Sequence, residues 1–124
     1  PVEATEWILQ NLDVKNMKLF NEYNYGSYLL YKGVPVFIDS RADLYAPEFN
    51  GKRAENGEYD GRDIFTDFIK TSSMERYYED TFEKYDITHI ILKKKSKLNT
   101  FISNDSGFLE MYNDDNFVVY ERCK

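Results

Sequence analysis

Two short apolar runs constrain the fold of this 124-residue chain more than any other feature of its sequence. Val36, Phe37 and Ile38 follow one another without a polar residue, and residues 87–92 read as the clearest buried strand. An uninterrupted apolar run is typical of a strand that is covered on both faces. The two runs therefore predict a central sheet that lies between layers of helices.

The segments around these runs predict the remaining elements. We expect helices over Pro1–Gln10, Tyr25–Tyr31, Gly61–Lys70 and Ser72–Lys84 and after Ser96, strands over Met17–Phe20, Pro35–Asp39 and Ile87–Leu92, and a hairpin of Phe108–Tyr112 with Phe117–Glu121. Residues 28–31 could also form a strand. A helix is preferred there because two parallel strands need a crossover between them. This order predicts an α/β domain, a three-layer α/β/α sandwich with a mixed, partly parallel sheet and a C-terminal hairpin.

Local signals mark several helix ends. Asn24 is in position to cap the second helix, which should end at Gly33. Ser72 followed by Glu75 resembles a capping box and predicts the start of another helix. Ser96 can cap the short helix that follows the strand at residues 87–92.

Composition excludes several classes of partner. The net charge of -6 argues against a nucleic acid, which requires a basic surface, and against adsorption to an anionic membrane. Cys123 is the only cysteine, so an intrachain disulfide is impossible. No apolar run reaches the ~20 residues that span a bilayer. Because the chain begins with Pro1, we expect residues 1–124 to be a single domain excised from a longer protein.

Polar residues follow the first two predicted strands. If those strands are parallel, their carboxyl ends meet at one edge of the sheet, where open α/β sheets bind ligands. The candidate binding edge comprises Asn21, Glu22, Asn24, Tyr25, Asp39, Arg41 and Asp43. Alternatively, Arg41 pairs with a neighbouring carboxylate only to hold the loop in shape. The long polar segment 42–60 that follows is either a functional loop or a mobile excursion.

No motif defines a reaction or a cofactor. GxGxxG, GxxxxGK and GxSxG are absent, so no catalytic residue and no cofactor is predicted. His89 lies inside a buried strand and is expected to be a neutral, satisfied core or edge histidine, not a catalytic base or metal ligand. Asp105, Asp114 and Asp115 lack a calcium-loop pattern, and no metal is predicted. The run Lys93–Lys95 is either a solvated strand end or an anion site.

A family resemblance covers nearly the whole chain. Its specific parts are FNEYNYG at residues 20–26, FIDSRAD at residues 37–43 and VYER at residues 119–122. The sequence resembles the carboxyl-terminal soluble domain that follows the transmembrane helices of bacterial polytopic membrane proteins. Those proteins are in turn similar to multispanning glycosyltransferases that use lipid-phosphate sugars, the GT-C-like, dolichyl-phosphate-mannose type.

A fainter similarity is to the extracytoplasmic domain of oligosaccharyltransferase catalytic subunits. There a Trp-Trp-Asp-Tyr-Gly motif helps to bind the acceptor peptide. Residues 22–26, EYNYG, keep an aromatic residue and the glycine but lack the tryptophans and the aspartate, so the likeness does not extend to peptide binding. In such enzymes the catalytic carboxylates and metal ligands come largely from the membrane part, which implies that this domain alone is inactive.

The resemblance implies an accessory domain on the extracytoplasmic face of the membrane. Its partners would be its own transmembrane portion and a carbohydrate or lipid-linked sugar, with the candidate edge facing them. The alternative is a structural or assembly module whose edge binds no ligand. A stand-alone cytosolic α/β enzyme is a third interpretation, and the missing nucleophile and cofactor motifs count against it.

Overall fold

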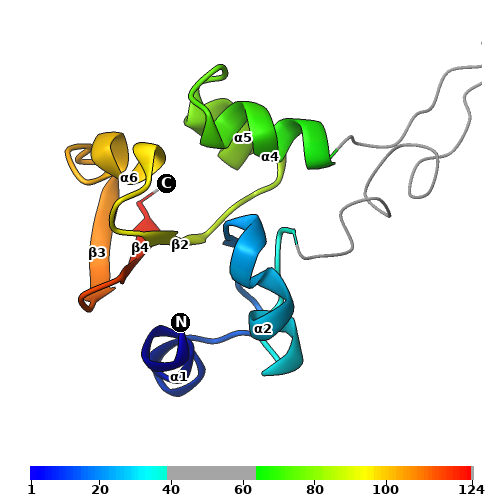
Figure 1. The fold of residues 1–124 in the computed structure, drawn as a ribbon, viewed down its shortest axis with the longest axis vertical. Coiled ribbons are helices and arrows are strands. Elements are labelled where there is room, and N and C mark those ends of the chain that lie inside the picture. The colour runs from blue at the N-terminus through cyan, green and yellow to red at the C-terminus, as the bar shows by residue number, and fades with distance from the viewer. Residues whose placement is uncertain (39–63, 124) are drawn as a thin grey trace, which may run out of the picture.

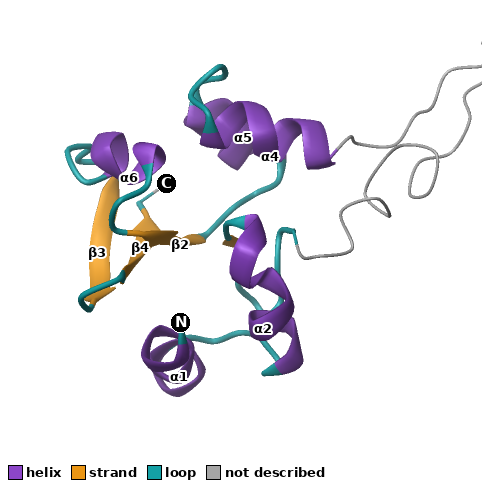
Figure 2. Ribbon diagram, viewed as in Figure 1, coloured by secondary structure: helices purple, strands orange, loops and turns teal. Residues whose placement is uncertain are grey.

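The structure is a computed structural model that describes residues 1–38 and 64–123 (Figure 1). Most of the helices precede the second strand, and the last two strands follow one another with no helix between them (Figure 2). The elements are α1 (Val2–Asn11), β1 (Leu19–Phe20), the 3-10 helix η1 (Tyr23–Tyr25), α2 (Gly26–Tyr31), α4 (Ile64–Ser72), α5 (Tyr78–Lys84), β2 (His89–Lys93), α6 (Lys97–Ile102), β3 (Phe108–Asn113) and β4 (Phe117–Arg122).

The four described strands form one mixed sheet in the order β1-β2-β4-β3. β1 pairs with β2 in parallel, with Phe20 opposite Ile90. β4 is antiparallel to both β2 and β3, and the β3–β4 pair is the predicted C-terminal hairpin. The predicted α/β fold with a mixed, partly parallel sheet is therefore confirmed.

The sheet separates two apolar cores because successive side chains of a strand point to opposite faces. Ile90 and Leu92 of β2 contact the core beneath α5 and α6, whereas Ile91 between them contacts the core beneath α1 and α2. All three are buried. In Figure 1 α1 and α2 lie on one side of the sheet and α4, α5 and α6 on the other. The apolar run in β2 is therefore explained, as expected, by burial of the strand on both faces.

The strand predicted over Pro35–Asp39 is wrong for its described part, residues 35–38, which form no strand. The apolar side chains are still buried, with Phe37 and Ile38 in the core. β1 pairs with β2 instead, and the side chain of Asn21 takes the backbone hydrogen bonds of residues 37 and 38. Burial therefore explains the apolar run without a strand. Asp39 lies outside the described residues.

Two of the predicted caps are wrong. Asn24 lies inside η1, and Tyr25 occupies the residue before α2. Ser72 is the last residue of α4, and α5 begins only at Tyr78, because the chain turns through Met74 at φ +66°. These helix starts follow from tertiary packing, which competes with local capping signals.

Two other helix ends are as predicted. Gly33 follows α2 with φ +92°, a conformation that favours glycine. Ser96 caps α6, its side-chain oxygen accepting a hydrogen bond from the N–H of Asn99 at 3.2 Å. Among the described residues, no helix has the length and apolar character needed to cross a bilayer.

Candidate binding site at the carboxyl ends of β1 and β2

The parallel pair β1 and β2 defines one edge of the sheet. Asn21 and Glu22 follow β1 directly, and Lys93 is the last residue of β2. Carboxyl ends of parallel strands meet at the same edge, and open α/β sheets place ligands there. One of the two predicted strand ends, that of β1, lies at such an edge, but its parallel neighbour is β2, because residues 35–38 form no strand.

Asn21 anchors residues 37 and 38 against this edge. Its side chain is fully buried, and Oδ1 accepts hydrogen bonds from the N–H groups of Phe37 at 2.6 Å and Ile38 at 3.4 Å. Its Nδ2 donates to the carbonyl oxygens of Ile38 at 2.7 Å and Glu22 at 2.9 Å. A buried amide with this many partners is typical of a positioning residue, since no polar atom is left to contact a ligand.

Glu22 joins the ends of the two strands through its carboxylate. Oε1 accepts a hydrogen bond from the backbone N–H of Lys93 at 2.7 Å and lies 2.9 Å from the hydroxyl of Tyr25. The Tyr25 hydroxyl also lies 2.9 Å from the carbonyl oxygen of Ile91 in β2. Burial and the nearby Glu22 carboxylate raise the pKa of Tyr25 well above its ordinary value, so the phenol stays protonated. This triangle fixes the backbone of both strand ends.

Of the other predicted site residues, the structure describes only Asn24. Asn24 is exposed on η1 and available to solvent. Asp39, Arg41 and Asp43 lie outside the described residues, so their part in the edge remains a prediction. The structure brings together Asn21, Glu22 and Tyr25.

A hollow beside this edge was not included in the predicted site. It has a volume of about 330 Å³ and is lined by Lys93, Lys95, Asp115, Asn116 and Phe117. A second hollow of about 450 Å³ shares its last three residues and extends to the start of α1. The lysine run was a signal for it in the sequence. The contribution of the hairpin turn could be found only from the pairing of β2 with β4.

The hairpin turn that lines the other side of this hollow is held together by hydrogen bonds to Asp114. Asp114 Oδ1 accepts hydrogen bonds from the N–H groups of Asn116 and Phe117, both at 2.8 Å. Its Oδ2 accepts one from the Tyr112 hydroxyl at 2.7 Å. Burial opposes ionisation of Asp114, but these hydrogen bonds outweigh it and lower the pKa of the carboxyl. The Asp114 carboxylate is thus occupied by the turn itself.

The site can bind by charge and hydrogen bonding. In residues 1–38 and 64–123 no three His, Cys, Asp or Glu side chains cluster as metal ligands would. The smaller hollow is lined by two lysines, an asparagine and an aspartate together with the aromatic residue Phe117. That ring is held edge-on against Tyr25, with centroids 5.1 Å apart. Such a surface suits a polar ligand with an apolar face.

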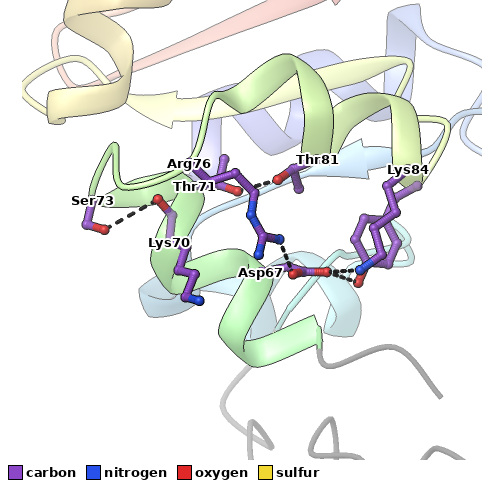
Figure 3. A network of polar contacts seen from close by, with 8 residues as sticks. Asp67, Lys70, Thr71, Ser73, Arg76, Thr81 and Lys84 are labelled. Carbon is purple, nitrogen blue, oxygen red and sulfur yellow. Dashed lines mark hydrogen bonds and ion pairs between the residues drawn. The ribbon is translucent and has the colours of Figure 1, made fainter. Parts of the chain in front are cut away.

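A second polar cluster lies away from this edge, between α4 and α5 (Figure 3). The carboxylate of Asp67 is nearly buried and is bonded by Arg76, Lys84 and Tyr85. Burial alone would raise the pKa of Asp67, but the hydrogen bonds from Lys84, Tyr85 and Arg76 lower it. Because each of these partners comes from the chain itself, the cluster is best explained as a clamp between the two helices.

His89 lies at the opposite end of β2 from the candidate site. Its Nδ1 is 2.9 Å from the Thr88 hydroxyl, while Nε2 is buried, makes no hydrogen bond and lies 3.6 Å from Glu121 Oε2. Burial lowers the pKa of His89, and the Glu121 carboxylate opposes this in part. The lowered pKa favours the neutral ring, as expected, but the expectation of a satisfied histidine is wrong for Nε2, which has no hydrogen-bond partner.

Comparison with known proteins finds a similar fold among solved structures, but no similar sequence. No protein-family model and no curated protein matches the sequence. Among solved structures, the chain is similar to the C-terminal globular domain of an oligosaccharyltransferase from Archaeoglobus fulgidus. The two superpose with a TM-score of 0.64 at 13% identity, covering 98% of this chain and 95% of that domain. The fold is thus one that also occurs as the globular domain of an oligosaccharyltransferase.

Proposed function

We propose that this chain is a non-catalytic extracytoplasmic accessory domain of a membrane-bound, glycosyltransferase-like protein. The observation that carries the proposal is the likeness in fold to the C-terminal globular domain of an oligosaccharyltransferase, which extends over nearly the full length of both chains. Coverage of this extent matters because the whole arrangement of helices and sheet is shared, not one supersecondary motif. The resemblance of residues 20–26 and 37–43 to the soluble domains of polytopic membrane proteins supports the same proposal.

The role proposed for the domain is to present the carboxyl edge of β1 and β2 to a carbohydrate acceptor or a lipid-linked sugar. Asn21, Glu22 and Tyr25 hold this edge in a fixed shape, and Asn24 lies exposed beside it. A rigid edge favours binding because little conformational entropy is lost when a ligand is held. The domain's partners would be its own transmembrane portion and the sugar that this portion handles.

Two measurements test the proposal. A reporter fused to the carboxyl terminus of the full-length protein should report an extracytoplasmic position, and a cytoplasmic position would contradict the membrane context. Separately, ¹⁵N-labelled chain would be titrated with methyl α-mannoside and with a short polyprenyl phosphate. Saturable shifts at the amides of Asn24 and Tyr25 are expected. If saturable shifts occurred only at other residues, the proposed role of this edge would be contradicted.

A second function, assembly without a ligand, is favoured by one specific observation. The polar atoms of Asn21 and the carboxylate of Glu22 already have partners within the chain. On this alternative the edge only packs the domain against its membrane portion. The same titration separates the two functions, because an assembly module should show no saturable shift at the amides of Asn24 and Tyr25 with either probe.

A further inference from the structure

We propose that the hollow lined by Lys93, Lys95, Asp115, Asn116 and Phe117 is a binding site for a phosphate-bearing ligand. We call it the lysine hollow. The inference deepens the proposed function by naming the charge of the ligand, and only the source of that ligand rests on the proposed function. The first argument is charge. Lys93 and Lys95 bring two ammonium groups to one concavity in a chain whose net charge is -6.

These lysines are not used by the fold. Neither has a hydrogen bond or ion pair through its ammonium group within the described part of the chain, and both are exposed. The two neighbouring lysines differ. The ammonium of Lys94 donates to Asn113 Oδ1 at 3.2 Å, and that of Lys97 donates to the carbonyl oxygen of Ser73 at 3.3 Å. Position in the run, and not merely the presence of lysine, therefore determines which ammonium groups are available.

The backbone that carries the two lysines is held at several points. The N–H of Lys93 donates to Glu22 Oε1 at 2.7 Å, and its carbonyl accepts from Ser96 N–H at 3.0 Å. The N–H of Lys94 donates to the carbonyl of Asn116 at 2.9 Å, and its carbonyl accepts from Asn99 Nδ2 at 3.0 Å. A fixed turn reduces the entropy lost when its side chains close on a ligand.

The acidic groups near the lysine hollow determine its net charge. Asp114 has its carboxylate oxygens occupied by the hairpin turn and by Tyr112. Glu22 directs Oε1 at the Lys93 N–H and the Tyr25 hydroxyl. Asp115 is the one acidic residue among the five that line the hollow, against two lysines, so this lining carries a net positive charge, and Glu3 lines only the adjoining larger hollow.

The lining also indicates the class of phosphate ligand. Lysine binds phosphate as a point charge, and the side-chain amide of Asn116 can donate to a further oxygen. The ring of Phe117 supplies an apolar surface next to these groups. This combination suits a sugar phosphate, whose CH faces pack on aromatic rings, better than a free phosphate ion.

Titration of ¹⁵N-labelled chain at constant ionic strength tests the site. The probes are inorganic phosphate, mannose 1-phosphate and, by co-sedimentation, vesicles that contain phosphatidylglycerol compared with phosphatidylcholine alone. We expect saturable shifts at Lys95, Asn116 and Phe117 with mannose 1-phosphate and weaker ones with phosphate. Binding only to the anionic vesicles would identify a lipid headgroup as the source of the phosphate. No saturable shift at these amides and no vesicle binding would overturn the proposal.

Matched variants separate a built site from diffuse charge. Lys93→Gln with Lys95→Gln should weaken binding by about ten-fold or more, since two charge-assisted contacts are lost. Lys94→Gln with Lys97→Gln removes the same two charges from side chains directed at Asn113 and Ser73, and should change the affinity less than about three-fold because an exposed charge acts weakly at a distance. Asp115→Asn should tighten binding by removing repulsion. Equal weakening by all the lysine variants would overturn the proposal.

The proposed function can fail without this site failing. A cytoplasmic carboxyl terminus of the full-length protein would remove the membrane context, while the phosphate shifts in the isolated chain would be unaffected. Conversely, an extracytoplasmic terminus together with no phosphate shifts would leave the accessory domain in place and reject the lysine hollow as a site.

Discussion

The side chain of Asn21 is hydrogen-bonded to the backbone of Ile38, donating to its carbonyl oxygen at 2.7 Å and accepting from its N–H at 3.4 Å. Asn21 also accepts a hydrogen bond from the N–H of Phe37. Its side chain thereby holds residues 37 and 38, a buried apolar segment that forms no strand. The backbone polar groups of a buried segment need partners, and here one amide supplies several of them. Asn21 thus connects the sheet edge to the residues that follow α2.

Replacing Asn21 with Ala should destabilise the fold by about 2–4 kcal/mol, because several buried backbone groups lose their partner at once. Urea unfolding of the purified chain measures this loss. Asn24→Ala is the matched control, since that side chain is exposed on η1, and it should cost less than about 0.5 kcal/mol. Equal effects of the two substitutions would contradict the anchoring role of Asn21.

Asp67→Asn should destabilise the contact between α4 and α5. The amide cannot act as acceptor for Arg76, Lys84 and Tyr85 together, which leaves cationic groups without their counter-charge. We expect a loss of about 1–3 kcal/mol in the free energy of unfolding, because Arg76 and Lys84 are partly exposed and regain solvation. Asp80→Asn, an exposed carboxylate at the start of α5, should have little effect.

The same carboxylate predicts the acid limb of the stability curve. The pKa of Asp67 is lowered in the folded state, so its contribution is complete above the unfolded value of about 3.9 and is lost as pH falls through the folded pKa. Unfolding followed by circular dichroism between about pH 5 and pH 2 should therefore show a smaller acid dependence for Asp67→Asn than for the wild type. An unchanged acid limb would rule out this linkage.

An element of this fold could be predicted from the sequence where the residues that determine it lie within the element itself. The strand at residues 87–92 and the hairpin at residues 108–122 could be predicted, because the apolar residues and the turn-forming residues that specify them lie within the segments themselves. Residues 35–38 were predicted as a strand from the same kind of apolar run. Their backbone instead meets an amide 16 or 17 residues earlier in the chain, which no local pattern records.

The residues of the candidate site also fall into two groups, those that local sequence predicts and those that depend on the pairing of distant strands. Asn21, Glu22 and Tyr25 could be chosen from the sequence because they follow a strand. Their link to Lys93 requires the parallel pairing of β1 with β2, a contact between residues 71 positions apart. Asn116 and Phe117 join the neighbouring hollow only because β4 pairs with β2. The long-range pairing of strands is the part that the sequence pattern could not supply.

Gly33→Ala should destabilise the chain by about 1 kcal/mol, although the added methyl group would meet nothing within 4 Å. The cost arises from the backbone, which at φ +92° is unfavourable for an L-residue with a Cβ. Gly33→Asn is the informative comparison, because asparagine tolerates positive φ better than alanine and should lose less stability. Thermal unfolding of the two variants ranks them, and a greater loss for Asn would show that space, not conformation, limits this position.

His89 predicts a loss of stability on mild acidification. Burial lowers its pKa in the folded state, with the Glu121 carboxylate opposing this in part, so the unfolded chain binds a proton more readily than the folded one. The contribution of the neutral ring is therefore complete above the unfolded pKa of about 6.5 and is lost as pH falls through the folded pKa. Urea midpoints at pH 7.5 and pH 5 should differ more for the wild type than for His89→Gln. Glu121→Gln, which removes the opposing carboxylate, should enlarge the difference, and a smaller difference in that variant would contradict the assignment.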